Sequence, residues 1–218
     1  MGRAQLAVAR QPRVGLISTG DELRSLGAPL AHGQIFGSNG ITLAGWVRKA
    51  GGIPVDCGQA TDTATDIVAA FRRAASCDAV VTTGGVSVGD FDYVTDAFAQ
   101  LGATVEFWKV AIKPGKPLAL GRHNKRPLFG LPGNPVSAQV TFLQFVWPWI
   151  RASMGCVAPY LPTVDARTDF PYRKKAGRME FVRVVIEYRP EGLWVRSTGD
   201  QGSGNPLSMA AADGLMVV

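Results

Sequence analysis

The stretch TTGGVSVGDFDY, residues 82–93, brings two adjacent glycines, a serine and two near-adjacent aspartates together after a valine-rich run. Backbone amides left exposed by glycines attract anions, whereas the carboxylates of Asp90 and Asp92 repel them. A metal ion held between a carboxylate and a phosphate would satisfy both kinds of group. The stretch therefore predicts a loop that binds a phosphorylated ligand together with a cation.

Two glycine-containing segments have the sequence of strand-to-helix turns. Gly84–Gly85 and Gly133–Asn134 each precede a predicted helix, so their free N–H groups are suited to hold a phosphate or another oxyanion. The plainer alternative is that these glycines only allow tight turns. Neither loop fits GxGxxG with a ribose-binding acid, or the GxxxxGKS/T pattern, which disfavours a dinucleotide-binding fold and a P-loop.

Acidic residues gather at three of the predicted strand ends: Asp21, Glu22, Asp62, Asp90 and Asp92. A lone loop aspartate usually caps a helix, and Asp62 and Asp90 each fit that role. Capping alone does not explain acids at three adjoining strand ends. Because no histidine or cysteine accompanies them, these oxygen donors favour Mg²⁺. His32 and His123 are expected in solvated loops.

The segment KPGKP, residues 113–117, holds Lys113 and Lys116 on a turn stiffened by proline. Such a pair of ammonium groups is often only solvated at a surface. Beside amides and acids, however, the two lysines favour a site for an anion together with a metal.

Serine-dependent hydrolysis is disfavoured. The spacing of GVSVG mimics the GxSxG elbow, but Ser18, Ser87 and Ser137 have no histidine placed as a base.

The composition is that of an ordinary globular protein, with 218 residues, 46% of them hydrophobic, and a net charge of +6. The apolar runs predict neither a membrane span nor a signal peptide. Cys57, Cys77 and Cys156 have the spacing of neither a disulfide framework nor a zinc site, which fits a reducing cytoplasm. The densest basic cluster, residues 172–178, suits a small anion at least as well as nucleic acid.

The elements that must position these residues alternate between strand and helix. Strands are predicted at 13–19, 53–58, 78–85 and 103–113, helices at 38–52, 63–76, 92–102 and 135–155, and a hairpin around 122–126. The last helix is expected to kink at Pro148. This order predicts an α/β fold with a mainly parallel sheet flanked by helices. Its loops should therefore meet at the carboxyl edge of the sheet.

The pattern changes after Gly155, which predicts a second domain. We expect an N-terminal extension over 1–12, an α/β domain over 13–155, a linker over 156–162 and a small β domain over 163–218. Alternating apolar residues at 179–189 and 193–199 predict antiparallel strands in a small barrel or sandwich that packs on the first domain.

Several segments occur in an order and spacing that resemble a known family: STGDEL, TTGGVSVGDFDY, FWKVAIKPGKP, GLPGNPVSA and QGSG. The family is that of the molybdopterin molybdenumtransferases, which includes bacterial MoeA and the E domain of gephyrin. The resemblance covers nearly the whole chain. It implies a MogA-like molybdopterin-binding domain with a β-barrel-like C-terminal domain, and insertion of molybdate into adenylylated molybdopterin with release of AMP, dependent on Mg²⁺.

The resemblance also implies roles for individual residues. The catalytic acids would be Glu22, Asp62 and Asp92, with Asp62 and Asp92 on the metal. The substrate pocket would contain Thr83, Gly84, Gly85, Ser87, Lys113, Lys116, Pro117, Gly133, Asn134, Ser137 and Arg178. The partners implied are a second copy of the chain, other cofactor-biosynthesis proteins and molybdoenzymes.

Two features depart from the family pattern. Gly37 stands where relatives commonly have an aspartate, and only a dozen residues precede the strand at Arg13, where relatives carry two further domains. In relatives the active site lies between this sheet domain and N-terminal domains of a partner subunit. A non-catalytic module that binds molybdopterin or a protein, and a molybdopterin adenylyltransferase, are therefore the alternative functions.

Overall fold

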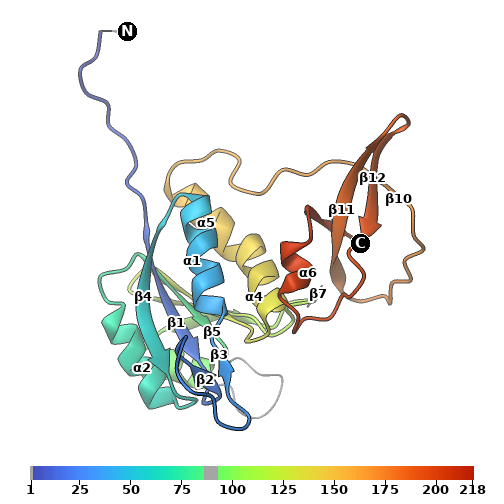
Figure 1. Ribbon diagram of the computed structural model, residues 1–218. Coiled ribbons are helices and arrows are strands. Elements are labelled where there is room, and N and C mark those ends of the chain that lie inside the picture. The colour runs from blue at the N-terminus through green and yellow to red at the C-terminus, as the bar shows by residue number, and fades with distance from the viewer. Residues whose placement is uncertain (1, 86–92) are drawn as a thin grey trace.

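The computed structural model describes residues 2–85 and 93–218, which form a six-stranded sheet covered by helices and a smaller sheet beside it (Figure 1). The strands of the large sheet are β1 Arg13–Thr19, β4 Ile53–Ala60, β5 Ala79–Thr83, β6 Thr104–Trp108, β8 Ala119–His123 and β9 Arg126–Leu131. Their order is β4-β1-β5-β9-β8-β6, in which β8 runs antiparallel to both of its neighbours and the other pairs are parallel. The predicted mainly parallel α/β sheet is therefore confirmed.

Alternating side chains of the central strands fill two apolar layers. Ile17 and Val80 pack in the layer under α2 (Ala64–Arg73) and α3 (Tyr93–Gln100). Leu16 and Val81 point the other way, toward α1 (Asn39–Ala50) and the helices after β9. Side chains along a strand alternate between its faces, so β1 and β5 are buried on both sides and lie at the centre of the fold.

The helix predicted at 135–155 is present, but it is not a regular α-helix throughout. It comprises α4 (Pro135–Thr141), a π-helical segment η1 (Phe142–Val146) and α5 (Trp147–Ser153). The departure from regular α-helix is the π-helical segment before Pro148, and not a kink at Pro148 itself as predicted. Proline lacks the N–H that would bond the carbonyl of Gln144, and its ring would clash there, so the widened π turn accommodates it.

The prediction of one continuous strand over 103–113 is wrong in its second half. It divides into β6 and a two-residue β7 (Ile112–Lys113), which leaves the large sheet. Lys109 has a φ of 66°, outside the extended region, and its amide bonds the Leu118 carbonyl at 2.8 Å. The chain therefore turns sharply after β6 and carries the lysine-containing turn to the edge of the sheet.

The predicted hairpin around 122–126 is confirmed. β8 and β9 pair antiparallel, and Asn124 and Lys125 between them have φ values of 50° and 67°. Such left-handed backbone at two central turn residues matches the twist of the strands. His123 is the last residue of β8, so its expected place in a loop is corrected.

The C-terminal residues form a half-barrel sheet. It contains β10 (Arg167–Thr168), β11 (Met179–Arg189), β12 (Gly192–Ser197) and β13 (Gly214–Val217), with the short α6 (Leu207–Ala210) nearby. β11 pairs antiparallel with β12, as the alternating pattern predicted, and also with β13, which the sequence pattern did not predict. β7 joins β11 in parallel, which ties this sheet to the first domain. A short parallel pair, β2 (Leu23–Arg24) and β3 (Ile35–Phe36), follows β1. Among the described residues, no helix has the length and apolarity to cross a membrane.

Candidate functional site

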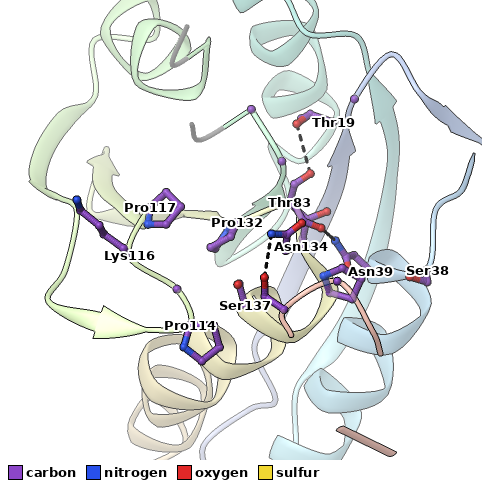
Figure 2. Close-up of a pocket in the computed structure, with 18 of the residues that line it drawn as sticks. Thr19, Ser38, Asn39, Thr83, Pro114, Lys116, Pro117, Pro132, Asn134 and Ser137 are labelled. Carbon is purple, nitrogen blue, oxygen red and sulfur yellow. Dashed lines mark hydrogen bonds between the residues drawn. The ribbon is translucent and has the colours of Figure 1, made fainter. Parts of the chain in front are cut away.

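A cavity of about 1220 Å³ opens at the carboxyl edge of the large sheet and extends to the C-terminal sheet. The loops after β1, β4, β5, β7 and β9 all contribute to its wall, as parallel topology predicts. In Figure 2, Lys116 and Pro117 lie on one side of this space and Ser38 and Asn39 on the other. One cavity thus collects segments that are far apart in the sequence.

Most of the residues predicted from the sequence line this cavity. They are Glu22, Asp62, Thr83, Gly84, Gly85, Lys113, Lys116, Pro117, Gly133, Asn134, Ser137 and Arg178. Ser87, Asp90 and Asp92 lie outside the described residues. Gly37 also lines the wall.

Backbone packs against backbone where the loops after β1, β5 and β9 meet. Gly84 has a φ of 93° and its amide donates to the Leu131 carbonyl at 3.1 Å. A Cβ on Gly133 would lie 3.5 Å from the Cα of Gly84. Thr19 donates its hydroxyl to the Thr83 carbonyl at 3.3 Å. A Cβ on Gly84 would lie 2.4 Å from the Thr19 carbonyl oxygen, so Gly84 is required for this close approach, whereas the contact at Gly133 is an ordinary one.

Polar side chains fix the start of α4, next to this backbone contact. Asn39 donates to the Gly133 carbonyl at 2.7 Å, and Asn134 donates to the Ser203 hydroxyl at 3.1 Å. The Val136 amide bonds the carbonyl of Ser203 at 3.1 Å. The start of α4 is therefore held from one side by α1 and from the other by the segment before α6.

Carboxylates form the acidic side of the cavity. The Asp62 amide donates to the Asp21 carboxylate at 3.2 Å, and Glu22 lines the same wall. Burial, followed by the charges of Asp21 and Glu22, raises the pKa of Asp62 above its ordinary value. Its Oδ1 is buried and lacks a hydrogen-bond partner within the described part of the chain. Thr63, whose side chain accepts from the Asp66 amide, is the cap of α2, so the capping alternative for Asp62 is wrong.

These carboxylates fit a hard cation through the chemistry of their oxygens. Across residues 2–85 and 93–218, no group of three or more His, Cys, Asp or Glu side chains is arranged to hold a metal. Mg²⁺ usually keeps several waters and shares phosphate oxygens, so it needs only one or two protein carboxylates. The unpartnered oxygen of Asp62 is the donor that suits this role best.

The cationic side differs between its two lysines. Lys113 lies 3.3 Å from a carboxylate oxygen of Glu180, in an ion pair that crosses to the C-terminal sheet. Lys116 is exposed at the cavity wall and forms no ion pair with a described residue. The sequence motif predicted the same environment for both lysines, whereas the fold places them in different ones.

Arg183 is a cavity residue that the sequence motifs did not indicate. It is only 1% exposed, and it donates to the carbonyls of Asp200 and Gly202 at 3.2 and 3.0 Å. Its Nε has no hydrogen-bond partner in the described structure, and burial lowers its pKa from the ordinary value. The strand pattern could have indicated that Arg183 is buried, because it lies two residues after Phe181 and therefore on the same buried face of β11.

Comparisons with known proteins define the class. Residues 15–152 match the model of a probable molybdopterin binding domain, and residues 165–218 match the MoeA C-terminal region, domain IV. The chain belongs to the MoeA family of molybdopterin molybdenumtransferases.

Relatives agree with this assignment. The chain is 41% identical to molybdopterin molybdenumtransferase 2 of Mycobacterium tuberculosis, over 99% of this chain and 54% of that protein. It is 40% identical to the enzyme of Haemophilus influenzae, over 93% of this chain and 51% of the relative. The MoeA structure from Pyrococcus horikosii superposes with a TM-score of 0.77 at 30% identity, covering 96% of this chain and 50% of that one. The chain spans about half the length of these relatives.

Proposed function

We propose that the chain inserts molybdate into adenylylated molybdopterin with release of AMP, in a Mg²⁺-dependent step. The observation that carries this proposal is the arrangement of one cavity. Peptide groups of glycine loops, an Asp62 oxygen that has no partner among the described residues, and cationic side chains all line a common space. A reaction between a phosphorylated substrate and an oxyanion needs all three kinds of group: donors for the phosphates, a carboxylate for the metal and cations for the oxyanion.

Each side of the cavity has a role in this proposal. The N–H groups of Gly85, Gly133 and Asn134 bind the pterin phosphates, together with Thr83 and Ser87, while Gly84, whose own N–H donates to the Leu131 carbonyl, shapes the loop. Molybdate is held by the cationic side and its neighbours, which are Lys113, Lys116, Pro117, Ser137, Arg178 and Arg183. Water cleaves the phosphoanhydride bond between AMP and the pterin phosphate, which releases AMP, and each molybdate oxygen that a pterin sulfur replaces leaves as water with the thiol proton.

The acidic side supplies the metal site in this proposal. Asp62 and Asp92 hold Mg²⁺ through their oxygens, and the bound ion would supply charge stabilisation to the phosphate linkage. Glu22 lines the same cavity as Asp62 and orients water or the substrate through its carboxylate. Asp92→Asn keeps the shape but loses the charge, so it is expected to reduce Mg²⁺-dependent turnover sharply in a folded protein.

The experiment is a metal-insertion assay with adenylylated molybdopterin, molybdate and Mg²⁺, read by AMP release and by reconstitution of an apo-molybdoenzyme. AMP release with reconstitution supports the proposed reaction. Binding of the pterin without AMP release would instead support a non-catalytic binding module. Adenylylation of free molybdopterin with ATP would indicate an adenylyltransferase.

The proposed function also carries expectations about the oligomeric state, the partners and the cellular location of the protein. We expect a homodimer, contacts with other cofactor-biosynthesis proteins and molybdoenzymes, no nucleic-acid partner and a cytoplasmic location. The domain limits 13–155 and 163–218, joined by a linker at 156–162, are also kept as proposed. Sedimentation of the purified chain measures its oligomeric state directly.

A further inference from the structure

The junction between the lysine-containing turn and the C-terminal sheet is formed by a short stretch of parallel pairing. Ile112 and Lys113 of β7 lie opposite Met179 and Glu180 of β11, and the Met179 amide donates to the Ala111 carbonyl at 2.8 Å. Glu180 also exchanges two backbone hydrogen bonds with Val218, each of 3.0 Å. The backbone of Glu180 is therefore fixed between β7 and the end of the chain.

The side chain of Glu180 connects the same two parts a second time. Its Oε2 accepts a hydrogen bond from the ammonium of Lys113 at 3.3 Å and another from the hydroxyl of Tyr172. Glu180 is only 4% exposed, and all three residues line the cavity. One buried carboxylate oxygen thus receives donors from the turn of the first domain and from the loop before β11.

The electrostatics keep this arrangement charged at neutral pH. The hydrogen bond from Tyr172, then that from Lys113, lowers the pKa of Glu180 despite its burial. Burial and the Glu180 carboxylate raise the pKa of Tyr172 to about 12, so the phenol remains a donor. Arg178 and Arg183 are the other charged groups that act on this pair. A buried carboxylate that loses its partners is costly, so each donor is held firmly in place.

We propose that Glu180 is a positioning residue, which fixes the Lys113 ammonium and the Tyr172 hydroxyl on the cavity wall so that the cationic side is preformed for an oxyanion. This inference rests on the proposed function for the nature of the ligand. Lys113 has a flexible stem with about half of its side chain exposed, at 52%, so without Glu180 its ammonium would spread over many rotamers.

The sign of one measurement separates positioning from a plain charge effect. Removing a negative charge from the cavity wall would strengthen anion binding by electrostatics alone. Loss of positioning has the opposite effect, because the ammonium must then be ordered by the ligand itself. Glu180→Ala is therefore expected to weaken molybdate binding about tenfold, whereas Glu180→Gln, which retains an acceptor for both donors, loses about threefold or less.

Molybdate binding is measured by calorimetry for both variants, with Glu187→Ala as the matched control. Glu187 is a carboxylate on the same strand that pairs with Arg189 and Arg196 away from the cavity, so its loss should leave molybdate affinity unchanged. Glu180→Ala that folds and binds molybdate as well as or better than the parent chain would overturn the proposal. If Glu180→Ala does not fold, Glu180→Gln and Tyr172→Phe decide it: a weaker affinity for molybdate in either variant supports positioning, and affinities equal to that of the parent chain in both refute it.

A measurement without ligand separates this inference from the proposed function. A double-mutant cycle of Glu180→Gln and Lys113→Met, followed by urea unfolding, measures their coupling directly. We expect Lys113→Met to change the unfolding equilibrium constant about fivefold less in the Glu180→Gln background than in the parent chain. Additive effects would exclude the positioning contact even if molybdate binds, while coupling in a chain that binds no molybdate would retain the contact and reject the proposed function.

Discussion

A Cβ added to Gly84 would lie 2.4 Å from the carbonyl oxygen of Thr19, so the backbones of two strand ends are in direct contact at the cavity. The clashing atom belongs to the backbone, so it cannot rotate aside as the end of a side chain would. Gly84 also has a φ of 93°, which a side chain would strain. The phosphate-binding loop proposed after β5 therefore depends on a glycine at this position.

Gly84→Ala is expected to lower the free energy of unfolding by about 2–4 kcal/mol, because strain and a backbone clash act together. Urea unfolding measures the change. Gly102→Ala is the control, since Gly102 also has a positive φ, of 68°, but nothing lies within 4 Å of its added Cβ. It should cost only about 1 kcal/mol. Equal costs for the two substitutions would show that the loop can shift to admit a side chain.

Asp62→Asn is expected to stabilise the chain at neutral pH, by up to about 1 kcal/mol, because it removes a carboxylate that burial and two acidic neighbours disfavour. The pKa of Asp62 is raised in the fold, so its folded form binds the proton more tightly than the unfolded chain does. Stability is therefore lost as pH rises through the ordinary aspartate range to the folded pKa. The advantage of the Asp62→Asn variant over the parent chain should vanish below about pH 4.

The same substitution should weaken Mg²⁺ binding, measured by calorimetry or by the Mg²⁺-induced rise in melting temperature. Asp66→Asn is a suitable control, since Asp66 lies in the first turn of α2 outside the main cavity. An unchanged response to Mg²⁺ in folded Asp62→Asn would remove Asp62 from the metal site.

Lys116→Ala is expected to weaken molybdate binding about tenfold or more in the pterin-bound state, since each lysine–oxyanion contact contributes roughly 1–3 kcal/mol. Pterin binding through backbone amides should change less. Arg72→Ala removes the same charge from the exposed side of α2, away from the cavity, and controls for the net charge of the chain. If both variants bind molybdate equally well, Lys116 is only a solvated surface residue.

Arg183→Gln is expected to reduce molybdate affinity more than Arg178→Ala does, because two carbonyls already fix the buried guanidinium and its Nε has no hydrogen-bond partner in the described part of the chain. We expect a loss of about tenfold or more for Arg183→Gln, measured by titration with molybdate. Arg196→Gln, in an exposed ion pair with Glu187, should have no effect. A larger loss from Arg178→Ala would assign the main contact to the arginine chosen from the motif.

The sequence predicted the layers of the fold because its strands β1 and β5 are buried runs and its helices have clear periodicity. Topology then explained why Asp62, Thr83, Lys116 and Asn134 meet at one edge. The local sequence pattern could not show that the strand predicted at 103–113 ends before Lys109. That end depends on a turn closed by the hydrogen bond from the Lys109 amide to the Leu118 carbonyl, nine residues along the chain.

Side-chain partners were also beyond the sequence pattern. The strand pattern could indicate that Arg183 is buried, but not that it donates to the carbonyls of Asp200 and Gly202, which β12 and the following loop bring back to β11. The pairing of Lys113 with Glu180 likewise follows from β7 leaving the large sheet. Both are tertiary effects that override what the local segments indicate.

The contact between Asn134 and Ser203 has a consequence for how the protein is made. Most of the C-terminal sheet lies between these two residues in the chain, so the cavity cannot close while that sheet is still emerging from the ribosome. The large sheet has all its strands by Leu131 and can collapse earlier, as domains commonly do during synthesis. This wall of the cavity is therefore complete only after Ser203 has been translated, and a nascent chain stalled before that residue would be a folded sheet with an incomplete binding site.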